Sequence, residues 1–301
     1  MLPTQHRVQF DFEIDFSNGG GMSGRDFRLD IAREEISDRE LADYLVADMR
    51  LLMVGAVRIL NKRIIAEAHK RDATAASVQR FVDLSHTIGH GIVTYKGLPA
   101  PMICDYLSRE ASREIYAAGT EFQIGKIEMV SNTGTYIDCP FHRYADGKDL
   151  SEVGIEALCD LDAIVVRADH RDAQAVGVEH FRGREIRGRA VLLHTGWDAY
   201  WNTPAYFDGH PFLTEEAAVC LRDGGARLVG IDSHNIDDTV RDLPGSKTRP
   251  VHSTLLGAGI LIVEHMTNLA GLPDSGFTFS AVPPKFKGVG TFPVRALAKL
   301  R

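Results

Sequence analysis

The chain lacks several features that mark particular classes of protein. None of its apolar runs is long enough to cross a bilayer, and its first residues carry no secretory signal. Repeats and low-complexity tracts are also absent. Its 301 residues are enough for one large core and a smaller appendage. The sequence therefore predicts a globular, cytoplasmic protein.

Charge of one sign is not concentrated anywhere. The net charge is -7 at pH 7, and the sequence contains no dense stripe of Lys and Arg. Binding to nucleic-acid phosphates requires such a basic surface. The hydrophobic and charged shares, 44% and 25%, are ordinary for globular proteins. We therefore expect neither nucleic acid nor a membrane as a partner.

Cysteine is scarce, and its spacing excludes two kinds of site. The chain has four cysteines and no CxxC pair; they are Cys104, Cys139, Cys159 and Cys220. Scattered cysteines of this kind are typical of reduced cytosolic thiols. We expect neither a disulfide framework nor a zinc ion held by cysteine.

The first part of the chain predicts a small β-β-α-β unit. Residues 8–16 alternate strictly between apolar and polar side chains, which is typical of a half-buried strand. A returning strand is predicted around 27–31, and a further strand at 57–65. Between them, Ser37 and Glu40 have the spacing of a capping box at the start of a helix.

The rest of the chain alternates strands with helical stretches. Residues 66–80 are rich in alanine and charge, and predict a linker or an exposed helical connection. We therefore predict two domains, 1–72 and 80–301. In the second domain we expect strands at 163–168, 190–194, 228–232 and 259–264, and a helix at 215–223.

The most informative segment runs from Asn132 to His142. Asn132, Tyr136 and Asp138 have the same parity, so on an extended strand they would point to one face. His142 shares that parity but follows Pro140, where a strand is expected to end or bend. A polar row on an apolar segment is costly unless it faces water, a partner or a ligand. The segment therefore predicts a functional site.

This segment resembles the signature of the cyclase family of metal-dependent hydrolases, which includes kynurenine formamidase and isatin hydrolase. That signature reads His-x-Gly-Thr-His-x-Asp-x-Pro-x-His. The matching residues here are Gly134, Thr135, Asp138, Pro140 and His142. Asn132 and Tyr136 stand where the family has two metal-binding histidines.

The resemblance extends over roughly three quarters of the chain. Its further landmarks, in order, are at 83–86, 192–197, 230–233, 252–256, 262–264, 283–285 and 293–296. The resemblance implies an α/β fold for residues 80–301, with a compact mixed β-barrel and surrounding helices. The N-terminal β-β-α-β extension lies outside it.

The resemblance also implies a site. By position, Asp138, His252 and Glu264 would hold the metal, and His142 would act as base and proton shuttle. Such a set suits one divalent ion, Mn or Zn, and two metals are not expected when two imidazoles are missing. Asn132 could add an amide oxygen as a ligand. Tyr136 could bind the metal as a phenolate or donate a hydrogen bond to a substrate oxygen.

Two features outside the signature leave alternatives open. Aromatic residues cluster within 197–207, which suits a wall for a planar substrate but equally core packing or a subunit interface. His234 follows the landmark at 230–233 and is a candidate for the rim of the pocket.

The implied activity is hydrolysis of the C–N bond of a small amide, as in an arylformamidase of tryptophan catabolism, or opening of a lactam or lactone ring. A divalent metal activates water and polarises a carbonyl, while a histidine moves the proton. Two alternatives remain. One is a non-catalytic protein that binds a small ligand, and the other is a metal-free dehydratase or isomerase that uses His142 and Tyr136. The resemblance also implies a homodimer or higher homo-oligomer.

Overall fold

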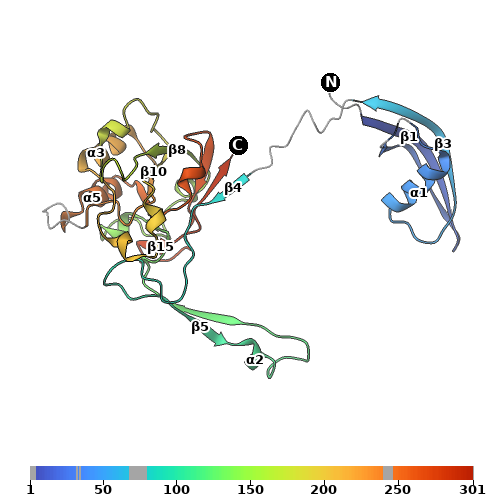
Figure 1. Ribbon diagram of the computed structural model, residues 1–301. Helices are drawn as coiled ribbons and strands as arrows, with labels where there is room; N and C mark the ends of the chain where they lie inside the picture. The colour runs from blue at the N-terminus through green and yellow to red at the C-terminus, as the bar shows by residue number, and fades with distance from the viewer. Residues whose placement is uncertain (1–4, 32, 34, 68–79, 240–246, 301) are drawn as a thin grey trace. The chain divides into compact units, whose positions relative to one another are not determined.

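The computed structural model describes residues 5–31, 33, 35–67, 80–239 and 247–300. The chain divides into two units, Met1–Val78 and Gln79–Arg301 (Figure 1). Most of the segment predicted to be a linker, 66–80, lies outside the described residues. All four cysteines are free. Among the described residues, no helix has the length and apolar character needed to cross a membrane.

The N-terminal unit has the predicted β-β-α-β order. Its elements are β1 (Gln5–Phe16), β2 (Gly21–Ile31), α1 (Asp38–Asp48) and β3 (Val54–Glu67). The strands form an antiparallel sheet in the order β2-β1-β3. Strand β3 is longer than the predicted 57–65. Ser37 and Glu40 form the predicted capping box, since the side chain of each hydrogen-bonds the backbone N–H of the other.

This unit has a hydrophobic core of its own. The alternating residues Val8, Phe10 and Ile14 of β1 are each at most 1% exposed. They belong to one cluster with Leu41 and Leu45, the buried residues of α1. The alternation along the sequence therefore corresponds to one face of the sheet covered by the helix.

The second unit is built on a nine-stranded mixed sheet that curls into a half-barrel. In sheet order its strands are β15 (Thr291–Pro293), β7 (Tyr136–Asp138), β13 (Leu261–Glu264), β12 (Leu228–Ile231), β10 (Ala190–His194), β8 (Leu161–Arg167), β14 (Phe277–Ser280), β16 (Leu297–Leu300) and β4 (Arg80–Asp83). Strands β8, β10, β12 and β13 are parallel to one another, and the flanking strands pair antiparallel.

Few helices lie in the described part of this unit. Helices α3 (Glu215–Gly224) and α5 (Pro250–Gly257) pack on the sheet, and α2 (Arg109–Ser112) follows β5 (Met102–Leu107). The 3-10 turns are η1 (Pro140–His142), η2 (Ile155–Ala157), η3 (Val178–His180), η4 (Trp197–Tyr200), η5 (Pro204–Phe207) and η6 (Leu269–Gly271). Helix α3 begins at the N-cap Thr214 and ends at Gly225, whose φ of 77° suits glycine.

The parallel strands are buried on both faces. Ile164, Val191 and Ile262 pack in a cluster that includes Leu221 of α3 and Leu255 of α5. The residues that alternate with them form a second cluster with β14 and β16, including Val165, Leu192, Val263, Phe279 and Ala298. This explains why these strands read as continuous apolar runs rather than alternating ones.

Two small sheets complete the unit. One pairs β9 (Ala175–Val176) with β11 (Phe212–Leu213), and the other is a hairpin of β5 (Met102–Leu107) and β6 (Ile124–Glu128). Figure 1 shows the hairpin and α2 extending away from the curled sheet. The hairpin carries apolar side chains that remain exposed, among them Tyr106 at 77%, Ile127 at 62% and Phe122 at 52%.

Candidate active site

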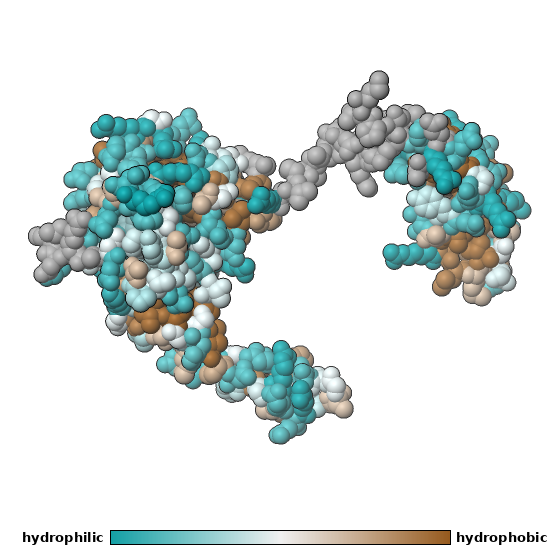
Figure 2. Space-filling model, in the orientation of Figure 1, coloured by the Kyte–Doolittle hydropathy of each residue, from teal (hydrophilic) through white to brown (hydrophobic). Residues whose placement is uncertain are grey.

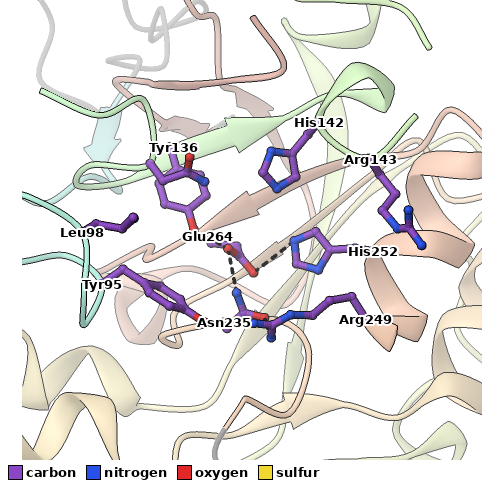
Figure 3. A pocket seen from close by; sticks show the side chains of 10 residues that line it. Tyr95, Leu98, Tyr136, His142, Arg143, Asn235, Arg249, His252 and Glu264 are labelled. Carbon is purple, nitrogen blue, oxygen red and sulfur yellow. Dashed lines mark hydrogen bonds and ion pairs between the residues drawn. The ribbon is translucent and has the colours of Figure 1, made fainter. Parts of the chain in front are cut away.

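The candidate site is a cavity of about 310 Å³ in the second unit (Figure 3). Its lining residues are Tyr95, Leu98, Asn132, Tyr136, His142, Arg143, Asn235, Arg249, His252 and Glu264. Five of the six residues predicted for the site are among them. The sixth, Asp138, is fully buried, and one of its oxygens lies 3.7 Å from His252 Nε2.

Strands β7 and β13 position the acidic groups. Their antiparallel register sets Tyr136 opposite Glu264 and Asp138 opposite Ile262. Because side chains alternate along a strand, Ile137 points the other way and is buried in the core. The Tyr136 hydroxyl donates a 2.6 Å hydrogen bond to Glu264 Oε2. The two strands thus bring one phenol and two carboxylates to the same side.

The predicted strand face is correct for Tyr136 and Asp138 but wrong for Asn132. Strand β7 begins only at Tyr136. Gly134, with a φ of 67°, turns the chain before the strand starts, and a Cβ there would come within 2.5 Å of Ile88. Asn132 therefore reaches the cavity from an irregular segment rather than from the strand.

Helix α5 presents His252 to the carboxylates. Asp237 accepts hydrogen bonds from the backbone N–H groups of Val251 (2.8 Å) and His252 (3.1 Å), at the start of the helix. The same carboxylate lies 2.6 Å from His252 Nδ1. This leaves Nε2 3.7 Å from Asp138 and 3.8 Å from Glu264. A carboxylate on one imidazole nitrogen is a common way to orient the other nitrogen towards a ligand.

His142 lies beside Asp138 and shares a hydroxyl with it. The Thr291 hydroxyl donates to Asp138 Oδ1 and lies 2.7 Å from His142 Nδ1. A hydroxyl has one proton, so when it donates to Asp138 it accepts from His142 Nδ1–H. His142 Nε2 is then the nitrogen free to take a proton. Ligand atoms of His142, Asp138 and His252 also lie within 4.8 Å of one another.

The electrostatics of the site tie His252 to its acidic neighbours. Burial alone would lower the pKa of His252, but hydrogen bonds to Asp138 and Asp237 and the charge of Glu264 raise it above its usual value. Burial raises the pKa of Glu264, and the charge of His252 opposes that shift. The acidic neighbours of His252 thus stabilise its charged, imidazolium form.

Tyr136 is placed as a neutral hydrogen-bond donor. Burial, followed by the charges of Glu264 and Asp138, raises its pKa well above the usual 10.0. Its hydroxyl is already donated to Glu264. The geometry therefore favours a hydrogen-bond donor over a metal ligand, but the acceptor is Glu264 and not the substrate oxygen expected from the sequence.

The residues present fit one divalent ion. Asp138 Oδ2 is buried and has no hydrogen-bond partner among the described residues, although it faces His252 Nε2. A buried carboxylate oxygen without a partner is costly, and a cation beside it would remove that cost. Carboxylates and imidazoles are a donor set that suits zinc or manganese.

Sequence reasoning missed seven residues that line or support this site: Tyr95, Leu98, Arg143, Asn235, Asp237, Arg249 and Thr291. Arg143 follows the signature, and Asn235 and Asp237 follow the landmark at 230–233, so their places in the chain were usable signals. Tyr95 and Thr291 are distant in sequence from the residues they contact.

The aromatic cluster at 197–207 does not line the cavity. Trp197 Nε1 donates to the backbone carbonyl of Tyr206, and the Tyr206 hydroxyl lies 2.9 Å from His265 Nδ1. His234, expected at the rim, is 3% exposed, and its ring packs against that of Tyr206. Core packing is therefore supported for Trp197 and Tyr206, which are 8% and 1% exposed.

Comparison with known proteins identifies the family. The family model described as a putative cyclase matches residues 82–238. Kynurenine formamidase from Bacillus cytotoxicus is 29% identical over 220 residues, which cover 73% of this chain and 97% of that protein. Kynurenine formamidase from Bacillus anthracis is 26% identical over 222 residues, which cover 73% of this chain and 97% of that protein. The chain belongs to the cyclase family.

Solved structures confirm the predicted fold class. A potential metal-dependent hydrolase with cyclase activity superimposes with a TM-score of 0.59 at 25% identity, covering 74% of this chain and 99% of that one. Isatin hydrolase A from Labrenzia aggregata, bound to benzyl benzoate, superimposes with a TM-score of 0.62 at 23% identity. The match covers 76% of this chain and 97% of that one. The second unit thus has the α/β architecture of this family.

Proposed function

We propose that the chain is a metal-dependent hydrolase that cleaves the C–N bond of a small amide, as an arylformamidase does, or opens a lactam or lactone ring. The observation that carries the proposal is that His252 Nε2 lies 3.7 Å from Asp138 and 3.8 Å from Glu264, beside His142 and at the wall of the cavity. The family membership and the likeness to kynurenine formamidases support it.

The proposal includes one divalent ion, Mn or Zn. Asp138, His252 and Glu264 would hold it, and Asn132 lies in the same cavity as a further oxygen donor. When bound, the ion would supply an activated water and would polarise the scissile carbonyl. Tyr136 holds Glu264 in place through its hydroxyl. Asp237 fixes the tautomer and direction of His252.

His142 moves the proton in this proposal. Thr291 fixes its Nδ1, so Nε2 accepts a proton from the attacking water and returns it to the leaving nitrogen. The side chain is 34% exposed, so its proton can exchange with solvent. Tyr95 and Leu98 line the same cavity and offer an apolar wall for an aromatic substrate.

A metal-free acid–base enzyme, such as a dehydratase or isomerase, is the second candidate. The hydrogen bond of Tyr136 to Glu264 and the ion pairs of His252 favour it, because protons alone satisfy most of the site. Non-catalytic ligand binding is the third.

One experiment separates these functions. The protein is purified without chelator and analysed for metals. It is then assayed with formanilide and N-formylkynurenine, before and after exhaustive chelation. We expect at most one tightly held ion per chain and hydrolysis that is lost on chelation and restored by Mn or Zn. Full activity after chelation would support acid–base chemistry without metal. Absence of any hydrolysis would favour the binding protein.

Hydrolysis of the kynurenine derivative would support a role in tryptophan catabolism.

We also propose that the protein is a homodimer through its hairpin. In β6, which pairs without interruption, Ile124 and Ile127 differ in parity, so both faces of the hairpin carry exposed apolar side chains. Figure 2 shows hydrophobic surface where the hairpin leaves the body of the unit. An isolated two-stranded hairpin is marginally stable in water. A second copy would cover both hairpins by symmetry.

A further inference from the structure

Two arginines line the cavity without an acidic partner. Arg143 and Arg249 both belong to the cavity wall, and neither forms an ion pair with a carboxylate among the described residues (Figure 3). A cation in a partly enclosed cavity is stabilised by an anion, and nothing described on the wall supplies one to either guanidinium. The wall is therefore suited to an anionic group of a ligand.

Among the described residues, the guanidinium of Arg249 is held in place by neutral groups. Its Nη2 donates to the Tyr95 hydroxyl at 3.0 Å, and its Nη1 donates to Asn235 Oδ1 at 3.4 Å. The side chain is only partly exposed. A guanidinium has five N–H donors, so several remain for a ligand. Asn235 in turn lies 3.4 Å from Glu264 Oε2, which fixes Arg249 relative to the reacting centre.

The backbone of Arg249 is in an uncommon conformation. Its φ of 51° and ψ of 61° are left-handed, and Pro250 follows directly. A residue without glycine's freedom rarely adopts this conformation, and such strain is concentrated at functional sites. The same residue precedes the helix that carries His252. The strained turn thus places the guanidinium and the imidazole on one wall.

Arg143 differs in each respect. It is exposed, its guanidinium lies 5.4 Å above the Tyr144 ring, and its Nε donates to Ser253 Oγ at 3.1 Å. Water and the aromatic ring stabilise its charge. Arg143 is therefore a matched control of equal charge in the same cavity wall.

We propose that Arg249 binds a carboxylate on the substrate, at the end remote from the scissile bond. This deepens the proposed function and rests on it: the substrate is an aryl amide that carries a carboxylate. Among the described wall residues, Glu264 is the one acid, and it is already bonded to Tyr136 and to the backbone N–H of Ile236. The wall thus offers a receptor for an anion and none for an ammonium group.

The kinetic test compares 4-formamidobenzoate with formanilide, which differ by one carboxylate. We expect kcat/KM of the wild type to favour 4-formamidobenzoate. In Arg249→Gly this preference should fall by about 10- to 100-fold, the scale of one charge-assisted hydrogen-bond pair. Glycine accepts the left-handed backbone, so this variant should fold. Arg143→Gln should keep the preference within about threefold, because the exposed charge is screened.

A binding test separates this inference from the proposed activity. Benzoate and benzamide are titrated calorimetrically into the full-length protein and both variants. Benzoate should bind about tenfold more tightly than benzamide to the wild type and to Arg143→Gln, and this difference should vanish in Arg249→Gly. Such a result without any hydrolysis of the anilides would support the carboxylate site and reject the hydrolase. If benzoate is still preferred in Arg249→Gly, the inference is overturned. Coordination of benzoate to a metal would give that result. Equal losses in the two variants would also overturn it.

Discussion

At the scale of single residues, hydrogen bonds between pairs of side chains organise the site. Thr291 connects His142 to Asp138, Tyr136 is bonded to Glu264, and Asp237 is bonded to His252. Each of these pairs fixes the donor or acceptor state of a group predicted to act in the site. The five signature positions that match the family are therefore only part of the chemistry, and their neighbours decide what each can do.

His142 is the first residue to test. His142→Asn should leave the circular dichroism spectrum unchanged and lower kcat by about 10²-fold or more, the usual scale for a positioned acid–base group. Thr291→Val, which frees Nδ1 and removes the fixed tautomer, should lower kcat less and alter its pH profile. Unchanged kcat and pH profile in His142→Asn would exclude His142 from the mechanism.

The replaced histidine positions give a second prediction. The double change of Asn132→His and Tyr136→His should raise zinc affinity by about tenfold or more, because imidazoles are better zinc ligands than an amide or a neutral phenol. Tyr136→Phe is the control, since it frees Glu264 without adding a ligand. Calorimetric zinc titration measures the change. Equal affinities in the wild type and the double variant would show that these side chains do not face the ion.

Buried histidines predict acid sensitivity. Burial lowers the pKa of His234 from 6.5 to about 3 and also lowers the pKa values of His210 and His265. The unfolded chain then binds more protons than the folded one, so their stabilisation is present above pH 6.5 and is lost as the pH falls below it. For His234 the loss should reach about 2 kcal/mol at pH 5, because each pH unit below the usual pKa of 6.5 costs about 1.4 kcal/mol.

Urea unfolding at pH 7.5 and pH 5 measures this effect. His234→Gln, which cannot take a proton, should reduce the loss of unfolding free energy between these two pH values. The same loss in wild type and variant would show that other groups control acid unfolding.

At the scale of elements, the strand register and the helix start assemble the site. The pairing of β7 with β13 sets Tyr136 against Glu264, and the capping of α5 by Asp237 aims His252. The β5–β6 hairpin is the exception, because several of its apolar side chains remain exposed. It is therefore the element on which the proposed assembly depends.

Charges on the hairpin should break the dimer. Light scattering should give a dimer for the wild type and a monomer for the pair Tyr106→Asp with Ile127→Asp, because a buried charge at an interface is costly. Lys285→Glu, an exposed change outside the hairpin, is the control and should leave the dimer intact. A dimer that persists in the double variant would exclude the hairpin as the interface.

At the scale of the whole molecule, each unit has its own core. The cluster around Phe10 and Leu41 belongs to the N-terminal unit, and those around Val165 and Leu255 belong to the second. A unit with its own core can fold alone. Residues 79–301 should therefore give a folded protein with unchanged kcat, with altered solubility or assembly as the main difference.

Circular dichroism, light scattering and the formanilide assay test this truncation. Retained near-ultraviolet signal and turnover are expected, with residues 1–78 expressed alone as the complementary sample. Loss of all folded protein from 79–301 would show that the two parts depend on each other.

The sequence by itself determined the family, the β-β-α-β unit and the residues of the signature. These follow from short-range patterns: alternation along 8–16, the capping box at Ser37, and fixed spacing between 132 and 142. Where a pattern depended on backbone geometry, as at Asn132, it was wrong, because the positive φ of Gly134 breaks the strand.

Only the tertiary structure decided which groups meet. Thr291 reaches His142 across 149 positions, and Arg249 reaches Tyr95 across 154. The hydrogen bond of Tyr136 to Glu264 depends on strand register, which a single sequence specifies only through the packing of the whole sheet. These contacts join segments that are far apart in the sequence and that only the folded core brings together. No local pattern in the chain therefore predicts them.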